Sequence, residues 1–259
     1  MALESSSDVP VFEGKADIHI HSASGDALPT PEEIIEHVEH NTDLDVVAIT
    51  DHDELEGAFQ ARELAAKKGY RVQVIVGCEI TTLDGHLLAL DIESPVRMLQ
   101  SVEKTIEAVH RQGGICIVPH PMSWLTLSVG HKVLLRVASS KSPTIYFDGF
   151  EVFNPSIAGR VAHERARNFN RSVLHLPEVG GSDAHHLHLI GTAYTLFEGK
   201  TSDDFRRSLA LGRTSAHGEF WQPNAQFEGF AALQLKSLVV HPTQKIRKAI
   251  ESVWGGRHA

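Results

Sequence analysis

Short runs of β-branched and other apolar residues alternate along the chain with longer segments that have helical spacing. The apolar runs occupy residues 16–21, 46–50, 73–80, 86–92, 114–120, 149–154, the segment before Asp183 and, as an eighth candidate, 192–197. Apolar runs of this length bounded by turn residues predict buried strands. Strands that alternate with helices predict βα units around a parallel sheet.

The segments between these runs have the amphipathic pattern of helices. The first opens with a capping box, in which Thr30 is followed by Pro31 and then by Glu33. Further helices are predicted at 54–69, 95–114 and 201–212, with glycine at their ends.

At 259 residues, 42% of them hydrophobic, the chain can bury the core of one large domain, and α/β barrels commonly have this length. We expect a flexible leader at 1–15, a barrel at 16–220 and a C-terminal extension at 221–259 that packs on the barrel. From Lys236 the extension carries five Lys or Arg residues against one acid, so a membrane-surface or partner helix is the alternative.

The net charge of -9 argues against a general nucleic-acid or membrane coating, although a local basic patch remains compatible with it. Cys78 and Cys116 lie in apolar runs without CxxC spacing, which predicts reduced core residues and disfavours zinc held by thiolates. No run reaches about 18 apolar residues, and the first residues lack a signal architecture. We therefore expect a cytoplasmic protein with no membrane span.

The chain has 17 histidines, and some of them lie at the ends of predicted strands. His19 and His21 close the first strand, and the period of two in a strand sends both imidazoles to the same face, which is a natural start for a metal site. A strand can also carry two histidines without any catalytic reason. Asp26 follows in a loop of small residues.

Other polar side chains interrupt or close the later strands. His52 lies between Asp51 and Asp53 directly after the second strand, where burial is costly unless the charges are paired or bound to metal. Glu79 lies within the apolar third strand, and an edge position facing solvent is the alternative for it. His86 opens the fourth strand, and we expect a hairpin-like turn to bring it to the other ligands.

Two more motifs complete the set. The flanking prolines of Pro119-His120-Pro121 restrict the backbone φ, which preorganises a ligand. Asp183 and His185 repeat the i, i+2 spacing at the seventh strand, which would send both side chains to one face. Nine oxygen and nitrogen ligands without sulfur exceed the needs of one ion, so we expect a binuclear or trinuclear site for Zn, Mn or Fe.

The motifs DIHIHSASGDALPTPEE, AITDHDELEG, VGCEITT, GHLLALDI, VPHP and GGSDAHH, in this order, resemble the polymerase and histidinol phosphatase (PHP) family of metal-dependent phosphoesterases. The resemblance spans roughly residues 16–197 and implies a distorted (β/α)7 TIM-like barrel with up to three metal ions. It assigns the first ion to His19, His21, Glu79 and Asp183, the second to Asp26, His52 and His185, and a third, bridged by Glu79, to His86 and His120. His186 and His188 have no counterpart in this set.

The chain departs from the family pattern in two places. Gly25-Asp26-Ala27 replaces the frequent Ser-Asp-Gly, which keeps the aspartate but can reshape its loop. A subgroup that hydrolyses nucleotides carries a long insertion between the fourth and fifth strands, and here only one helical segment separates His86 from His120. That subgroup's substrate is therefore not carried over.

The resemblance implies hydrolysis of a small phosphomonoester or a nucleotide-type phosphate by a metal-bridged hydroxide. Short nucleic acids are further candidate substrates. Asp183, His185 and Glu79 would form the catalytic centre, Arg160 and His163 would bind phosphate with Asn154 as a polar contact, and Asp51 and Asp53 would orient ligands. A solvated helix charge is the alternative for Arg160.

Two other functions stay open at this stage. An amidohydrolase-like C–N hydrolase also uses an HxH motif on a barrel, although it usually needs a bridging Lys or Glu and two later histidines. A PHP module can also serve as a metal-stabilised scaffold or regulatory partner without turnover. Complete ligands argue against degeneration but do not demonstrate catalysis.

Overall fold

The computed structural model describes residues 11–221. All but the first residue of the predicted extension at 221–259, and most of the predicted leader at 1–15, therefore lie outside the described residues. The described chain folds into one nine-stranded sheet with the order β7-β6-β5-β4-β3-β2-β1-β8-β9. The strands are β1 Gly14–Ile20, β2 Val46–Ile49, β3 Gln73–Thr82, β4 Gly85–Leu90, β5 Ile115–Val118, β6 Gly149–Phe153, β7 Glu178–Gly180, β8 Ala193–Phe197 and β9 Thr214–Gly218.

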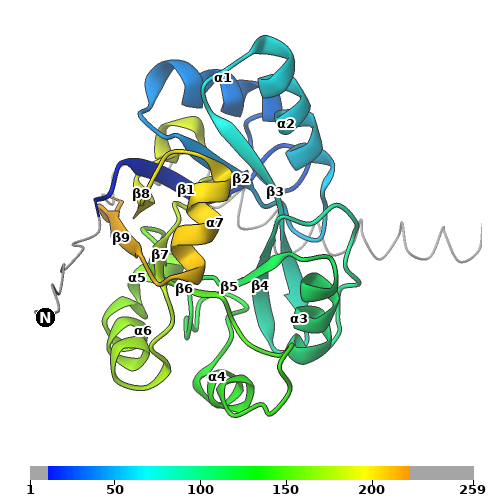
Figure 1. The fold of residues 1–259 in the computed structure, drawn as a ribbon, viewed down its shortest axis with the longest axis vertical. Coiled ribbons are helices and arrows are strands. Elements are labelled where there is room, and N and C mark those ends of the chain that lie inside the picture. Colours follow the sequence, from blue (N-terminus) through cyan, green and yellow to red (C-terminus); the bar gives the residue numbers. More distant parts are fainter. Residues whose placement is uncertain (1–10, 222–259) are drawn as a thin grey trace, which may run out of the picture.

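The two ends of this sheet meet. Thr195 Oγ1 of β8 donates to the carbonyl oxygen of Gly180 at 3.0 Å, and Thr214 Oγ1 of β9 donates to that of Glu178 at 2.9 Å. The sheet therefore curls into a nearly closed barrel, which confirms the predicted distorted TIM-like barrel (Figure 1).

The helices lie around this barrel (Figure 1). They are α1 Pro31–Asn41, α2 Glu56–Lys68, α3 Val102–Arg111, α4 His131–Ala138, α5 Ile157–Arg160, α6 His163–Phe169 and α7 Ser202–Ala210. The predicted capping box is present, because Thr30 Oγ1 accepts from the Glu33 amide and the Glu33 side chain accepts from the Thr30 amide. No helix within residues 11–221 is long and apolar enough to cross a membrane.

The predicted helix at 95–114 is shorter in the structure. Ser101 caps its first turn, and α3 covers only Val102–Arg111. The preceding residues are held by the sheet, since the Leu99 amide donates to the Thr81 carbonyl oxygen at 2.8 Å. Backbone pairing to β3 thus replaces helix formation there.

The prediction of a parallel sheet is wrong for two strands. β4 runs antiparallel to β3 and β5, and β8 runs antiparallel to β1 and β9. A two-residue turn joins β3 to β4, as the expected hairpin required. Gly85 starts β4 with φ +129, and a Cβ there would lie 2.4 Å from backbone atoms of Ser128 and Val129, so the close approach needs glycine.

Two apolar clusters lie on the two faces of the sheet. The outer cluster joins the strands to α1, α2, α3 and α4. The inner cluster joins residues such as Ile75, Leu88 and Ile117 to Phe205 and Leu209 of α7, which closes one end of the barrel. The carboxyl ends of the parallel strands meet at the opposite end.

Candidate metal centre

A change of alternation in β1 turns two histidines toward the barrel interior. Ile18 belongs to the inner apolar cluster, whereas Ile20 belongs to the outer one. The register of β1 against β2 shifts between Asp17 and Ile20, as it does at a β-bulge. His19 and the following His21 are fully buried on the inner side, which confirms that they share a face.

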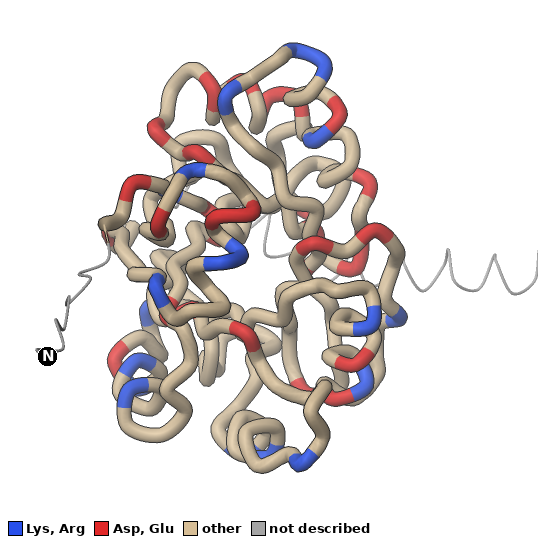
Figure 2. The backbone as a smooth tube through the Cα atoms, in the orientation of Figure 1, with Lys and Arg blue, Asp and Glu red and all other residues tan. Residues whose placement is uncertain are grey.

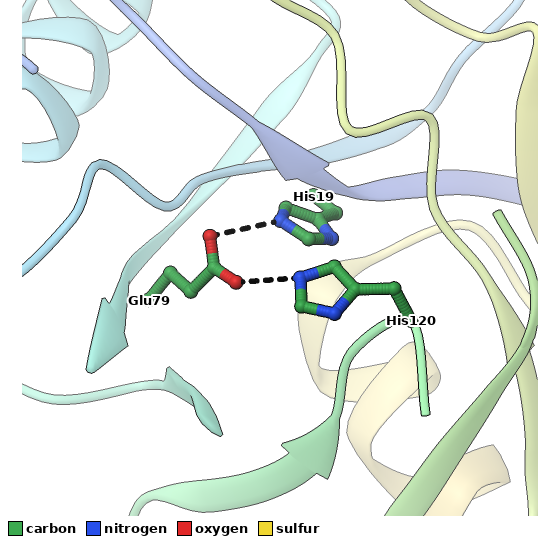
Figure 3. A group of neighbouring side chains, drawn as sticks. All are labelled: His19, Glu79 and His120. Carbon is green, nitrogen blue, oxygen red and sulfur yellow. Dashed lines mark hydrogen bonds and ion pairs between the residues drawn. The ribbon is translucent and has the colours of Figure 1, made fainter. Parts of the chain in front are cut away.

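Glu79 lies at the centre of the histidine cluster and is 1% exposed. Its Oε2 lies 3.3 Å from both His19 Nε2 and His21 Nε2. Its Oε1 lies 2.9 Å from both His86 Nδ1 and His120 Nε2. Figure 3 shows the carboxylate between His19 and His120. Glu79 therefore faces two histidine pairs with separate oxygens, and the alternative of a solvent-facing edge position is wrong.

Asp26 lies close to a second group of histidines. Its Oδ1 lies 3.4 Å from His185 Nε2, and its Oδ2 lies 3.9 Å from His52 Nε2. Its Oδ1 also lies 3.5 Å from His21 Nδ1, whose ring stacks on that of His185 with centroids 4.3 Å apart. His21 thus lies between the Glu79 group and the Asp26 group.

Asp183 reaches the cluster from a bent backbone. β7 ends at Gly180, and Asp183 has φ 55, so the expectation that Asp183 and His185 leave one strand on the same face is wrong. The Ile20–Ala184 bridge holds this segment against β1. Asp183 Oδ1 consequently lies 3.4 Å from His21 Nε2 and 3.6 Å from His19 Nε2.

His120 also lies beyond the end of its strand. Its φ is +28, a left-handed conformation that differs from the extended backbone expected between two prolines. Two contacts hold it there, since its amide donates to Glu151 Oε2 at 2.6 Å and its Nδ1 lies 2.9 Å from Ser128 Oγ. The ring is therefore fixed with Nε2 toward Glu79.

Glu151 of β6 is a site residue that the sequence analysis did not identify. It is 2% exposed, and its Oε1 lies 2.9 Å from His19 Nδ1. A Cβ at Gly181 would lie 2.6 Å from this oxygen, so the glycine leaves room for the carboxylate. A lone carboxylate inside the apolar run GFEVF was the available signal, the same one that identified Glu79.

Asp51 and Asp53 act on backbone next to the candidate ligands. Asp51 accepts from the amide and the hydroxyl of Ser22, both at 2.6 Å. Asp53 accepts from the amide of Thr81 at 2.7 Å. Asp17 similarly accepts from the Ser182 amide, and burial raises its pKa to about 6 against the hydrogen bonds that lower it.

The predicted phosphate contacts have other partners within the described residues. Asn154 Nδ2 donates to Glu151 Oε2 at 2.9 Å and to Asp183 Oδ2 at 3.4 Å, so its amide positions two carboxylates. The Arg160 guanidinium lies 5.2 Å from the centroid of the Phe220 ring, and His163 Nδ1 lies 2.9 Å from the Val152 carbonyl oxygen. Phosphate binding by Arg160 and His163 stays a prediction.

Burial opposes the charged form of each of these groups, and mutual attraction outweighs burial at His21, Glu79, Asp26 and Asp183 but not at His52. Burial alone would lower the pKa of His21, but Asp183 and Glu79 raise this pKa to about 10. Burial would raise the carboxyl pKa values of Glu79, Asp26 and Asp183, but neighbouring histidines hold all three well below the usual range. Burial dominates at His52 and lowers its pKa to about 4. The cluster therefore favours bound positive charge over neutral side chains.

The donor set fits divalent ions. Both ring nitrogens of His21 and both carboxylate oxygens of Asp26 are buried without a hydrogen bond to any described residue. Burying such atoms unsatisfied is costly, whereas ions would satisfy them together. Groups of three ligand atoms within 4.8 Å include His19, His21 and Asp183, and also His21, Asp26 and His185. Histidine and carboxylate donors suit Zn, Mn or Fe.

The chain is similar in sequence to several known proteins. Protein MJ1587 of Methanocaldococcus jannaschii is 31% identical over 175 residues, which are 63% of this chain and 94% of that protein. The phosphoribosyl 1,2-cyclic phosphate 1,2-diphosphodiesterase of Eggerthella lenta is 32% identical over 101 residues, and the chain covers only 37% of its length.

A solved structure is similar to the whole barrel. It is a two-domain protein from Bacteroides vulgatus that contains a predicted PHP-like metal-dependent phosphoesterase, with a TM-score of 0.63 and 21% identity over 82% of this chain and 67% of that one. The PHP domain model matches residues 17–173, and a PHP-associated model matches residues 161–214. The chain belongs to the PHP domain family.

Proposed function

We propose that the chain is a metal-dependent phosphoesterase that hydrolyses a small phosphorylated substrate. The observation that carries the proposal is Glu79, whose two carboxylate oxygens face separate histidine pairs beside the unsatisfied atoms of His21 and Asp26. In the hydrolysis one water is consumed, a P–O ester bond breaks, and phosphate and an alcohol are released.

The structure supports the assignment of nine ligands to two or three ions of Zn, Mn or Fe. His19, His21, Glu79 and Asp183 would hold one ion, His52 and His185 would join Asp26 around another, and His86 with His120 would use the second oxygen of Glu79. Bound divalent ions supply Lewis acidity and lower the pKa of water to about 7.

The other residues would keep these ligands in one protonation state and orientation. The Glu151 carboxylate would accept a hydrogen bond from the Nδ1–H of His19, which leaves the lone pair of Nε2 to bind an ion on the Glu79 side. The Asn154 amide holds Glu151 and Asp183 in place. Second partners of this kind fix the tautomer and ring direction of metal-binding histidines.

Phosphomonoesters and nucleotide-type phosphates are the proposed substrates. The Eggerthella lenta relative is a diphosphodiesterase for a phosphoribosyl cyclic phosphate, and this similarity supports phosphate-ester chemistry here. Nucleotides, short nucleic acids and a cytoplasmic location remain part of the proposal.

The test is hydrolysis of p-nitrophenyl phosphate by protein loaded with Mn, Zn or Fe. Panels of amides and lactones measure hydrolysis of C–N and C–O bonds by the same protein for comparison. We expect metal-dependent release of phosphate that Asp183→Ala abolishes. Preference for an amide would favour the amidohydrolase alternative. No turnover of any phosphoester, with only thermal stability lost in Asp183→Ala, would instead show a metal-stabilised scaffold.

A further inference from the structure

The loop between β5 and α4, residues 121–130, is an uncharged segment beside the candidate metal centre. Its sequence, PMSWLTLSVG, contains no Asp, Glu, Lys, Arg or His. Three of its side chains are unusually exposed for their type, with Trp124 at 71%, Leu125 at 42% and Leu127 at 59%. Large apolar side chains gathered in this way mark a binding surface more often than scattered single ones do.

The base of this loop is fixed to two candidate ligands. Ser128 Oγ lies 2.9 Å from His120 Nδ1, and the Leu127 carbonyl oxygen accepts from the His86 amide at 2.9 Å. The Met122 amide donates to the Val129 carbonyl oxygen at 3.1 Å, which brings the two ends of the loop together. Trp124, Leu125 and Leu127 therefore project from a segment held at the edge of the centre.

The segment that follows β6 also exposes an apolar side chain. β6 lies beside β5, and α5 after it exposes Ile157 at 38%. The Met122 carbonyl oxygen accepts from Arg165 of α6 at 2.5 Å, which ties this helix to the 121–130 loop. The guanidinium is thus engaged with the backbone of the uncharged loop.

Charge argues against a long nucleic acid as the occupant. Proteins that bind nucleic acid use Lys and Arg that follow the phosphate backbone. The 121–130 loop supplies none, and Figure 2 shows acidic positions interspersed among the basic ones along the backbone. The exposed indole and leucines match a neutral aromatic group instead.

We propose that the 121–130 loop binds an aromatic or otherwise apolar alcohol portion of a phosphomonoester, with Trp124 as its stacking surface. This inference rests on the proposed phosphoesterase function and names its substrate class. Trp124 would determine specificity through KM, whereas the metal ligands would determine turnover.

The test compares 1-naphthyl phosphate, glycerol 3-phosphate and a short 5′-phosphorylated single-stranded oligonucleotide on metal-loaded full-length protein. We expect Trp124→Ala to raise KM for 1-naphthyl phosphate about tenfold while KM for glycerol 3-phosphate stays within about twofold. Trp124→Phe keeps an aromatic surface and should restore most of the affinity. Leu127→Ala should raise the same KM by about threefold, and Leu211→Ala, a 58% exposed leucine beyond α7 at the other end of the barrel, should leave it unchanged.

Four results would overturn the inference. Equal KM changes for the two esters in Trp124→Ala, or no change for 1-naphthyl phosphate, would show that the loop does not bind the alcohol. A kcat/KM for the oligonucleotide that exceeds the value for 1-naphthyl phosphate would show a nucleic-acid substrate. In each of these three cases the phosphoesterase proposal stands. Hydrolysis of none of the three substrates by wild-type protein would overturn the proposed function as well.

Discussion

Two clusters of histidines and carboxylates lie within residues 11–221, and they differ in their hydrogen bonds. Near the opposite end of the barrel, His110, Cys116 and Asp148 also have ligand atoms within 4.8 Å of one another. His110 Nδ1 lies 2.8 Å from the Thr144 carbonyl oxygen, and its Nε2 lies 2.9 Å from Asp148 Oδ2. Both nitrogens therefore have hydrogen-bond partners, whereas those of His21 have only the longer contacts to Glu79, Asp183 and Asp26 and no hydrogen bond to a described residue.

The difference shows which property identifies a metal site. The Asp148 carboxylate also accepts from the Cys116 amide at 2.8 Å, so it links α3 to the strands as a structural ion pair. Burial raises the pKa of the Cys116 thiol, which opposes the thiolate that a metal requires. By residue types alone the two clusters would be equally good candidates for a metal site. The buried atoms of His21 and Asp26 that lack a hydrogen bond distinguish the candidate metal centre from the other cluster.

The largest expected effect is at Glu79. Glu79→Gln removes the negative charge that faces the two histidine pairs and also His52, whose Nδ1 lies 3.4 Å from Oε2. We expect metal binding to collapse and turnover to fall at least about a thousandfold. Metal content by mass spectrometry and phosphate release measure the two losses. Glu32→Gln, the same change on the exposed side of α1, should alter neither, and an active, metal-replete Glu79→Gln protein would contradict the assignment.

Two adjacent histidines provide the next comparison. His185 lies 3.4 Å from Asp26, whereas the ring of His186 lies 5.5 Å from that of His188 outside the cluster. We expect His185→Ala to lose an ion and about a hundredfold or more in kcat, and His186→Ala to stay within about twofold of wild type. Steady-state kinetics on both variants decides this, and a fully active His185→Ala enzyme refutes the ligand role.

A smaller effect is expected at Glu151. Glu151→Gln can still accept from His19 but puts an amide where Oε2 accepts from the His120 amide and from Asn154. We expect metal affinity to fall about 10- to 100-fold. The free energy of unfolding of the metal-free protein should change far less. Competition titration with a chelating dye measures the affinity, and unchanged affinity would leave Glu151 a purely structural residue.

The smallest effect on function is expected in the cluster of His110, Cys116 and Asp148. Burial lowers the pKa of His110, but Asp148 and the Thr144 carbonyl oxygen raise it above the usual 6.5 overall. This stabilisation is fully present below pH 6.5 and is lost as pH rises through the raised folded value. His110→Gln should therefore lose stability most at acidic pH, with metal content and kcat unchanged.

Urea unfolding across pH measures the gap between His110→Gln and wild type. A gap that widens toward alkaline pH would contradict the charged pair. Loss of a bound ion in this variant would show instead that the second cluster holds metal, and the comparison between the two clusters would then fail.

Much of the fold could be predicted, because the pattern of strands and helices depends on local spacing. β4 was identified as a strand, but its antiparallel direction depends on the two-residue turn before Gly85 and on backbone contacts with Ser128. β9 was missed because its sequence TSAHG has no apolar run.

The candidate ligands were predictable as residues but not as geometry. Strand periodicity could not reveal the register shift that turns His19 inward, nor the positive φ of His120 and Asp183. Those conformations are held by tertiary contacts such as the Glu151 hydrogen bond to the His120 amide. Sequence spacing carries no information on such long-range partners.

The most direct test of the central claim is the number of divalent ions bound per chain after equilibrium dialysis, measured on wild type, Glu79→Gln and His110→Gln. The account predicts two or three ions in wild type and in His110→Gln, and loss of at least two in Glu79→Gln. Fewer than two ions in wild type, or an equal loss in the two variants, would contradict it.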